Sequence, residues 1–105
     1  MQSLNNLFSN RVFYYFNEIS KIPHGSGDMQ KIADYCVNFA KKHSLRYYLD
    51  DAKNVIVYKS ATKGFENAEP VILQGHLDMV CQKTADSKTD FLRDGLELYL
   101  DGDFL

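Results

Sequence analysis

The sequence has 105 residues, of which 45% are hydrophobic, enough for one domain with one core and too few for two. Its twelve Lys and Arg residues nearly balance fourteen Asp and Glu residues, and no basic stripe with interleaved aromatic residues is present, which excludes nucleic acid as an expected partner. We expect no membrane partner either, because no apolar stretch approaches the length that spans a bilayer.

The first residues and the cysteines predict a cytoplasmic protein. Residues 1–6 are polar and lack the basic start and apolar stretch of a secretory signal. The two cysteines, Cys36 and Cys81, lie far apart in the sequence and form no CxxC pair, so we expect reduced thiols. Cys81 is expected to be a small buried thiol.

The first half of the chain predicts two amphipathic helices. From Ser9 to Ile22 the apolar residues recur at helical spacing, and Ser9 or Asn10 can cap the first turn. Pro23 and the Gly-Ser-Gly run at 25–27 then favour a turn. A second helix follows, with Asp28 favouring its amino end through charge and capping. The apolar face of this second helix comprises Ile32, Ala33, Cys36, Val37 and Ala40.

The second half predicts strands. Residues 45–49, 54–58 and 71–74 are short segments rich in β-branched, aromatic or aliphatic residues and are separated by polar turns. Residues 96–100 alternate between apolar and polar, which favours a half-exposed strand, and Asp101-Gly102 offers a tight hairpin turn. The predicted fold class is therefore α/β, with two helices followed by a mixed sheet.

The residues that could carry chemistry are His76 and Asp78, which directly follow the apolar run at 71–74. If the chain stays extended, their side chains point to the same side. A neutral imidazole is a good zinc ligand, and a nearby carboxylate can bind the metal or orient the ring. No HExxH or CxxC spacing supplies further ligands. From the residues alone, a structural interpretation stays open, in which His76 is a hydrogen-bonded histidine at a strand end and Asp78 forms a turn.

Other polar residues give weaker indications. His24, in the loop between the helices, is expected to be solvated, and His43 to interact with the carboxyl end of the second helix. The Gly-Ser-Gly run lacks the pattern of a phosphate loop, and no nucleophile motif surrounds Ser26. An acidic run matches no calcium loop and is expected to be solvated surface. It comprises Asp86, Asp90, Asp94, Glu97, Asp101 and Asp103.

Residues 71–83, Val-Ile-Leu-Gln-Gly-His-Leu-Asp-Met-Val-Cys-Gln-Lys, resemble the first metal-site motif of the aminoacyl-histidine dipeptidases. This family includes the cytosolic non-specific dipeptidases and is related to the aminoacylase and carboxypeptidase-G dinuclear zinc metallopeptidases. The resemblance extends in order over nearly the whole chain. The supporting segments are residues 16–23, 26–27, 54–59 and 94–98.

The resemblance implies that residues 1–105 are the amino-terminal portion of a catalytic domain, with no second domain present. His76 would bind one of two zinc ions, and Asp78 would be the carboxylate that holds and tunes its ring. The complete enzyme would hydrolyse aminoacyl-histidine and other dipeptides with a metal-activated water. The family's remaining ligands and its general base lie beyond Leu105, so we expect this chain alone to be inactive.

A rival interpretation is a non-catalytic module that acts through self-association or protein interaction. It would bury the sheet surface that the rest of a catalytic domain would otherwise cover. Self-association is expected under both interpretations.

Overall fold

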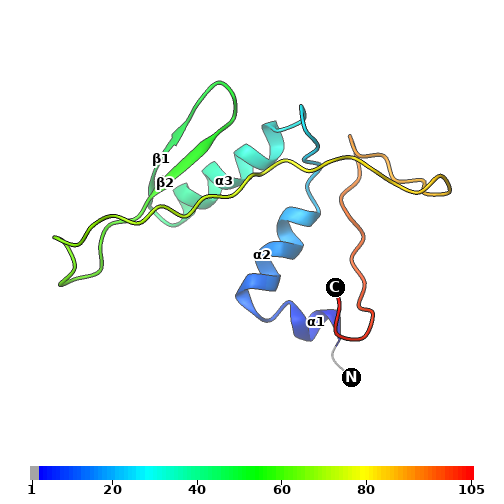
Figure 1. Cartoon of the computed structure of the whole chain (residues 1–105), viewed down its shortest axis with the longest axis horizontal. Helices are drawn as coiled ribbons and strands as arrows, with labels where there is room; N and C mark the ends of the chain where they lie inside the picture. The colour runs from blue at the N-terminus through cyan, green and yellow to red at the C-terminus, as the bar shows by residue number, and fades with distance from the viewer. Residues whose placement is uncertain (1–2) are drawn as a thin grey trace.

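The chain folds into short helices followed by a hairpin and long extended segments (Figure 1). The computed structural model describes residues 3–105, so Met1 and Gln2, which begin the segment that we expected to contain no signal, lie outside the described residues. The α/β fold class is confirmed, and the sheet consists of two antiparallel strands. The elements are α1 (Leu4–Leu7), α2 (Arg11–Ser20), α3 (Gln30–Lys42), β1 (Arg46–Leu49) and β2 (Val55–Tyr58).

Helix α2 begins and ends where its flanking residues require. The Asn10 side chain accepts a hydrogen bond from the Val12 amide at 2.9 Å, which confirms the predicted cap. The helix ends at Ser20, before Pro23, which disfavours helical backbone at the residue preceding it. Its predicted apolar face is left partly open, since the Val12 side chain is 74% exposed.

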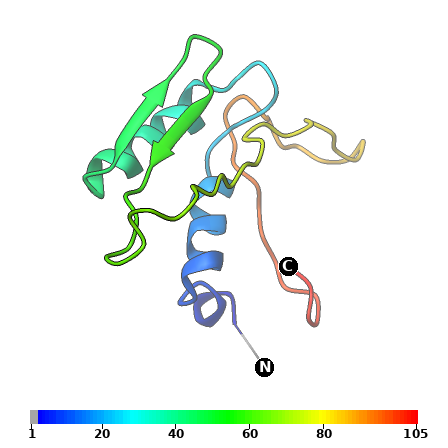
Figure 2. The same cartoon turned by 60° about the vertical axis from the view of Figure 1, so that its left-hand side comes forward.

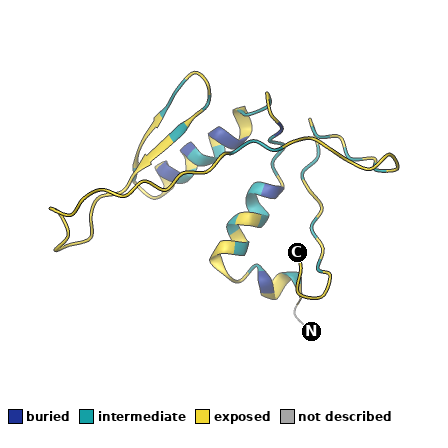
Figure 3. Cartoon of the chain, viewed as in Figure 1, coloured by how far each residue is buried: buried dark blue, intermediate teal, exposed yellow. Residues whose placement is uncertain are grey.

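Helix α3 carries the core of the chain, and the β1–β2 hairpin contacts it (Figure 2). In Figure 3 the buried residues concentrate along this helix. Burying a side chain such as Ile32, which is 1% exposed, contributes about 1.5–3 kcal/mol. Met29 occupies the capping position of α3 without a side-chain hydrogen bond, so the expected capping by Asp28 is wrong. The buried residues of α3 are Ile32, Ala33, Val37 and Ala40, as its apolar pattern predicts.

The hairpin is held in register by its turn. β1 pairs with β2 from Arg46 opposite Tyr58 to Leu49 opposite Val55. Across the turn, the Asp50 carboxylate accepts hydrogen bonds from the side-chain and backbone nitrogens of Asn54, both at 2.8 Å. These two bonds favour the ionised carboxylate, and they hold the pKa of Asp50 below its ordinary value.

The hairpin should lose stability in acid for this reason. Because the pKa of Asp50 is lowered on folding, its contribution is present above the ordinary aspartate pKa of about 3.9 and is lost as the pH falls through the lowered value. We expect Asn54→Ala to raise the pKa of Asp50 toward the ordinary value, measured by NMR titration of its carboxyl carbon. Asp50→Asn serves as the control and should flatten the acid limb of hairpin stability. An unchanged Asp50 pKa in the Asn54 variant would contradict the assignment.

The strands predicted at 71–74 and 96–100 do not form. Residues 71–74 are extended (Figure 1), yet Val71, Ile72 and Leu73 are 84%, 88% and 93% exposed, and the strand predicted for this apolar segment is wrong. A strand needs a neighbour that takes up its backbone N–H and C=O groups, and within residues 3–105 none pairs with either segment as a ladder.

The carboxyl-terminal segment is instead fixed to the end of α2. The Leu96 amide donates to the Ser20 carbonyl oxygen at 2.7 Å. Gly95 passes so close to the Lys21 backbone that a Cβ atom there would lie 2.5 Å from the Lys21 carbonyl oxygen. The predicted turn at Asp101-Gly102 is confirmed, since Asp101 and Phe104 form an antiparallel bridge.

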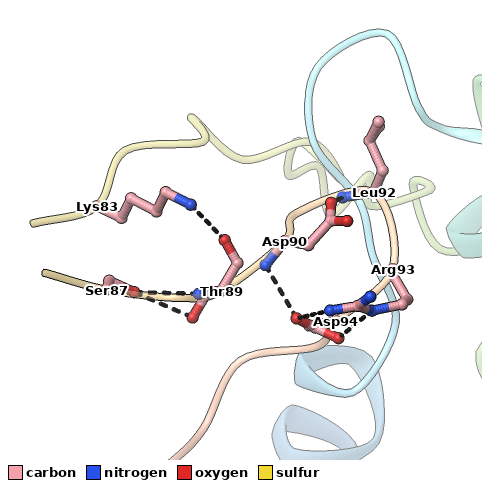
Figure 4. A network of polar contacts seen from close by, with 7 residues as sticks. All are labelled: Lys83, Ser87, Thr89, Asp90, Leu92, Arg93 and Asp94. Carbon is pink, nitrogen blue, oxygen red and sulfur yellow. Dashed lines mark hydrogen bonds and ion pairs between the residues drawn. The ribbon is translucent and has the colours of Figure 1, made fainter. Parts of the chain in front are cut away.

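Polar side chains order the loop between the candidate site and this segment (Figure 4). The Lys83 ammonium donates to the Thr89 carbonyl oxygen at 2.6 Å, and the Asp90 amide donates to the Asp94 carboxylate at 2.9 Å. Arg93 pairs with Asp94 at 3.0 Å and holds the pKa of that carboxyl below its ordinary value. Asp90 and Asp94, two residues of the acidic run, thus form their hydrogen bonds and ion pair within this loop.

The chain is more extended than a compact domain of its length. Its radius of gyration is 16.7 Å, against about 13 Å for a compact domain of 100 residues. Its accessible surface is 8907 Å², against roughly 6000 Å² for a folded monomer of this mass. Much apolar surface therefore remains uncovered. No helix within residues 3–105 has both the length and the apolar character needed to cross a bilayer.

Candidate functional site

The side chains of His76 and Asp78 lie together on one side of the extended chain, as their alternation predicts. His76 Nδ1 is 2.7 Å from the Asp78 carbonyl oxygen and 3.1 Å from its carboxylate Oδ1. Because a carbonyl and a carboxylate oxygen only accept hydrogen bonds, the neutral ring must carry its proton on Nδ1. The lone pair of Nε2 is then free, and the His76 side chain is 82% exposed.

The second carboxylate oxygen of Asp78 is held by Ser26. The Ser26 hydroxyl donates to Asp78 Oδ2 at 2.6 Å. This hydrogen bond, and next to it the one with His76, lower the pKa of the Asp78 carboxyl below its ordinary value. Asp78 is therefore an anion at neutral pH. Ser26 donates to a carboxylate whose pKa is lowered, and such a weak base does not activate a serine as a nucleophile.

Backbone hydrogen bonds join the loop before α3 to the segment that carries Asp78. Gly25 and Met79 form a parallel bridge, in which the Ser26 amide donates to the Met79 carbonyl oxygen at 3.2 Å. The Met79 amide in turn donates to the His24 carbonyl oxygen at 3.0 Å. Ser26 and Asp78 are 52 positions apart in the sequence, so no local pattern could have indicated this contact.

His24 and Cys81 differ from their expectations. The His24 ring is half-buried and its Nδ1 lies 2.6 Å from the Ile22 carbonyl oxygen, so it is held by the loop and is not simply solvated. Cys81 is exposed, contrary to the expected buried thiol, because its segment runs over the surface. Both cysteines are free thiols, in agreement with the expected reduced state. His43 ends α3 as expected and packs against Phe39 with 4.3 Å between ring centroids.

Gly25 lies beside the Cys81 side chain, close to the bridge between the two segments. It is buried, and a Cβ atom at this position would overlap with the Cys81 sulfur. Any larger residue must displace Cys81 or separate the loop from Met79. The glycine at position 25 thus leaves room for the side chain of a residue distant in sequence.

We expect Gly25→Ala to weaken the bridge by about 1–3 kcal/mol, the usual cost of overpacking. The measurement is hydrogen exchange of the Ser26 and Met79 amides, which should speed up. The double variant Gly25→Ala with Cys81→Ala removes the overlapping sulfur and should restore slow exchange, and Cys81→Ala alone is its control. Failure of the double variant to restore protection would show that another contact limits this position.

A hollow of about 580 Å³ lies beside the pair, which is within the size range of small-ligand sites. Residues 74–78 form one wall, β2 residues 55–57 another, and Cys36 of α3 also contributes. His76 and Asp78 are the only histidine and acidic side chains among the lining residues. The hollow therefore places the pair beside a mixed lining, in which Ser26, Lys53, Asn54 and Gln74 are also polar.

The pair fits part of a metal site. Across residues 3–105, no three His, Cys, Asp or Glu side chains gather so that they could hold a metal ion. His76 offers one free nitrogen, whereas both carboxylate oxygens of Asp78 are already engaged by His76 and Ser26. Zinc normally takes three or four protein ligands. The donor set fits one ligand with its orienting carboxylate, and further ligands would have to come from outside these residues.

Comparison with known proteins identifies relatives of the whole chain. No family model matches it. The cytosol non-specific dipeptidase of Escherichia coli (strain K12) is 38% identical over all 105 residues, and the chain spans 22% of the length of that protein. The crystal structure of aminoacylhistidine dipeptidase from Vibrio alginolyticus superposes with a TM-score of 0.89 at 36% identity, covering 96% of this chain and 21% of the solved one. The whole chain is thus similar in sequence and in fold to these two dipeptidases, and it spans about a fifth of the length of each.

Proposed function

We propose that this chain forms the amino-terminal portion of the catalytic domain of a zinc-dependent dipeptidase, which hydrolyses aminoacyl-histidine and other dipeptides. The observation that carries the proposal is the His76 ring, whose Nδ1 is engaged by Asp78 while its Nε2 is free. The names of the two relatives support the substrate class. The relative named as a cytosol enzyme supports a cytoplasmic location.

His76 would hold one of two divalent metal ions, for which zinc suits the imidazole donor. When bound, such ions supply a water of lowered pKa and polarise the peptide carbonyl. Asp78 acts through His76: it fixes the orientation of the ring, keeps the proton on Nδ1 and raises the basicity of Nε2. The exposure of His76 leaves its free nitrogen accessible to an ion.

The isolated chain is inactive in this proposal. One imidazole ligand gives far less affinity than a complete dinuclear site, and the described residues contain no group of three His, Cys, Asp or Glu side chains that could hold a metal ion. A general base for the attacking water is also needed, and Asp78 is occupied with Ser26 and His76. Turnover therefore depends on groups that other parts of a larger protein would supply.

Zinc titration of the chain tests the role of His76. Following the imidazole signals of the three histidines by NMR, we expect the His76 signals to change first as zinc is added, since Asp78 makes its free nitrogen the strongest donor. His76→Ala should remove this change, with His24 and His43 as internal controls. No hydrolysis of an aminoacyl-histidine dipeptide is expected with zinc or manganese. Signals of His24 or His43 that shift at lower zinc concentrations than those of His76, or turnover that survives His76→Ala, would refute the assignment.

A second candidate function is self-association of the chain as a non-catalytic module. It is favoured by Val71, Ile72 and Leu73, which are extended and between 84% and 93% exposed. An extended apolar segment without a ladder partner is a template for pairing with another strand. We propose that a second copy of this chain pairs with this segment when no other part of a peptidase domain covers it.

We expect Ile72→Lys to reduce this self-association, because a charge in the exposed apolar row opposes strand pairing. Sedimentation velocity over a range of concentrations provides the measurement. Val12→Lys is the matched control, since Val12 is a similarly exposed apolar residue on α2, at 74%. Equal sedimentation of wild type and the Ile72 variant, with both monomeric, would remove the second candidate.

A further inference from the structure

We infer that Ser26 is a positioning residue of the candidate metal site, which acts on His76 through Asp78. The inference rests on the proposed function and extends it to a residue in the loop before α3. Its basis is a chain of two hydrogen bonds: Ser26 Oγ donates to Asp78 Oδ2 at 2.6 Å, and Asp78 Oδ1 accepts from His76 Nδ1 at 3.1 Å. Each oxygen of the carboxylate thus has one donor.

Two donors on opposite oxygens fix both the position and the plane of a carboxylate, whereas one donor leaves the side chain free to turn about its Cα–Cβ and Cβ–Cγ bonds. Asp78 needs this restraint because its side chain is 43% exposed and no packed side chain confines it on all sides. The His76 ring is still more exposed, at 82%. The orientation of the imidazole therefore depends on hydrogen bonds and not on packing.

The Ser26 hydroxyl is itself well placed to restrain Asp78. Its own amide donates to the Met79 carbonyl oxygen at 3.2 Å, and the Met79 amide donates to the His24 carbonyl oxygen at 3.0 Å. These backbone hydrogen bonds hold residue 26 beside residue 78 independently of the hydroxyl. Buried Gly25 lies against the Cys81 side chain, next to these backbone bonds. The loop before α3 thus serves as the support of the His76 and Asp78 pair.

Other roles for Ser26 do not fit its contacts. A nucleophilic serine would donate to a base, but the Ser26 hydroxyl donates to a carboxylate that is already engaged with His76. A helix-capping serine would accept from the first turn of α3, but Met29 holds the capping position of that helix. The Ser26 hydroxyl instead joins two segments that lie 52 positions apart in the sequence. It donates to Asp78, which is the partner of the candidate ligand His76.

The test compares Ser26→Ala, Ser26→Thr and the control Ser60→Ala, which alters an exposed serine, in the full 105-residue chain without metal. Three-bond NMR couplings to the Asp78 carboxyl carbon report its χ1 rotamer. We expect one rotamer in wild type, averaging over several in Ser26→Ala, and one rotamer again in Ser26→Thr, which retains the hydroxyl. Exchange of the Met79 amide should stay slow in all three variants, since the backbone bridge does not involve the hydroxyl.

A single Asp78 rotamer in Ser26→Ala would overturn the inference. So would a Ser26→Thr variant that averages like the alanine variant, or loss of Met79 protection in both, because the hydroxyl would then support only the loop. A second arm adds zinc ions: we expect a several-fold weaker change of the His76 signals in Ser26→Ala than in Ser26→Thr. If zinc leaves His76 unchanged in every chain, the proposed function fails, while the metal-free rotamers still decide the role of Ser26.

Discussion

The parallel bridge between Gly25 and Met79 is the constraint on which the candidate site depends. It brings a loop between two helices against a segment that lacks regular secondary structure. Without it, His76 and Asp78 would still be neighbours in sequence, but nothing would fix the carboxylate from its other side. Beside the bridge, the absence of a side chain at Gly25 leaves room for the Cys81 sulfur. The site is thus built from two backbone segments, with polar side chains added where they meet.

Local patterns predict the local elements well. The cap at Asn10, the apolar face of α3 and the turn after Leu100 all follow from residues within a few positions of one another. The alternation at residues 76 and 78 also places the two side chains on the same side, as the structure has them. In each case the residues that interact are a few positions apart, within one helical turn or one short extended segment. Their interaction can therefore be predicted from the sequence.

Predictions that depend on distant partners are wrong or missing. Residues 71–74 have the composition of a buried strand, but burial and pairing require neighbours that residues 3–105 do not provide. The expected burial of Cys81 fails for the same reason. No motif surrounds Ser26, and its relation to Asp78 exists only in three dimensions. The resemblance to the dipeptidases does not reveal this contact.

The distance along the chain between Ser26 and Asp78 also affects how the site forms. Closing a loop of this length costs about 3–4 kcal/mol of chain entropy, and few contacts offset that cost here. We therefore expect helix α3 and the hairpin, whose contacts are local, to fold first. The contact between Ser26 and Asp78 should form last on folding and break first on unfolding. A larger protein that packed against residues 71–79 would keep Ser26 and Asp78 in contact. The free energy of that packing would then also fix the orientation of the His76 imidazole.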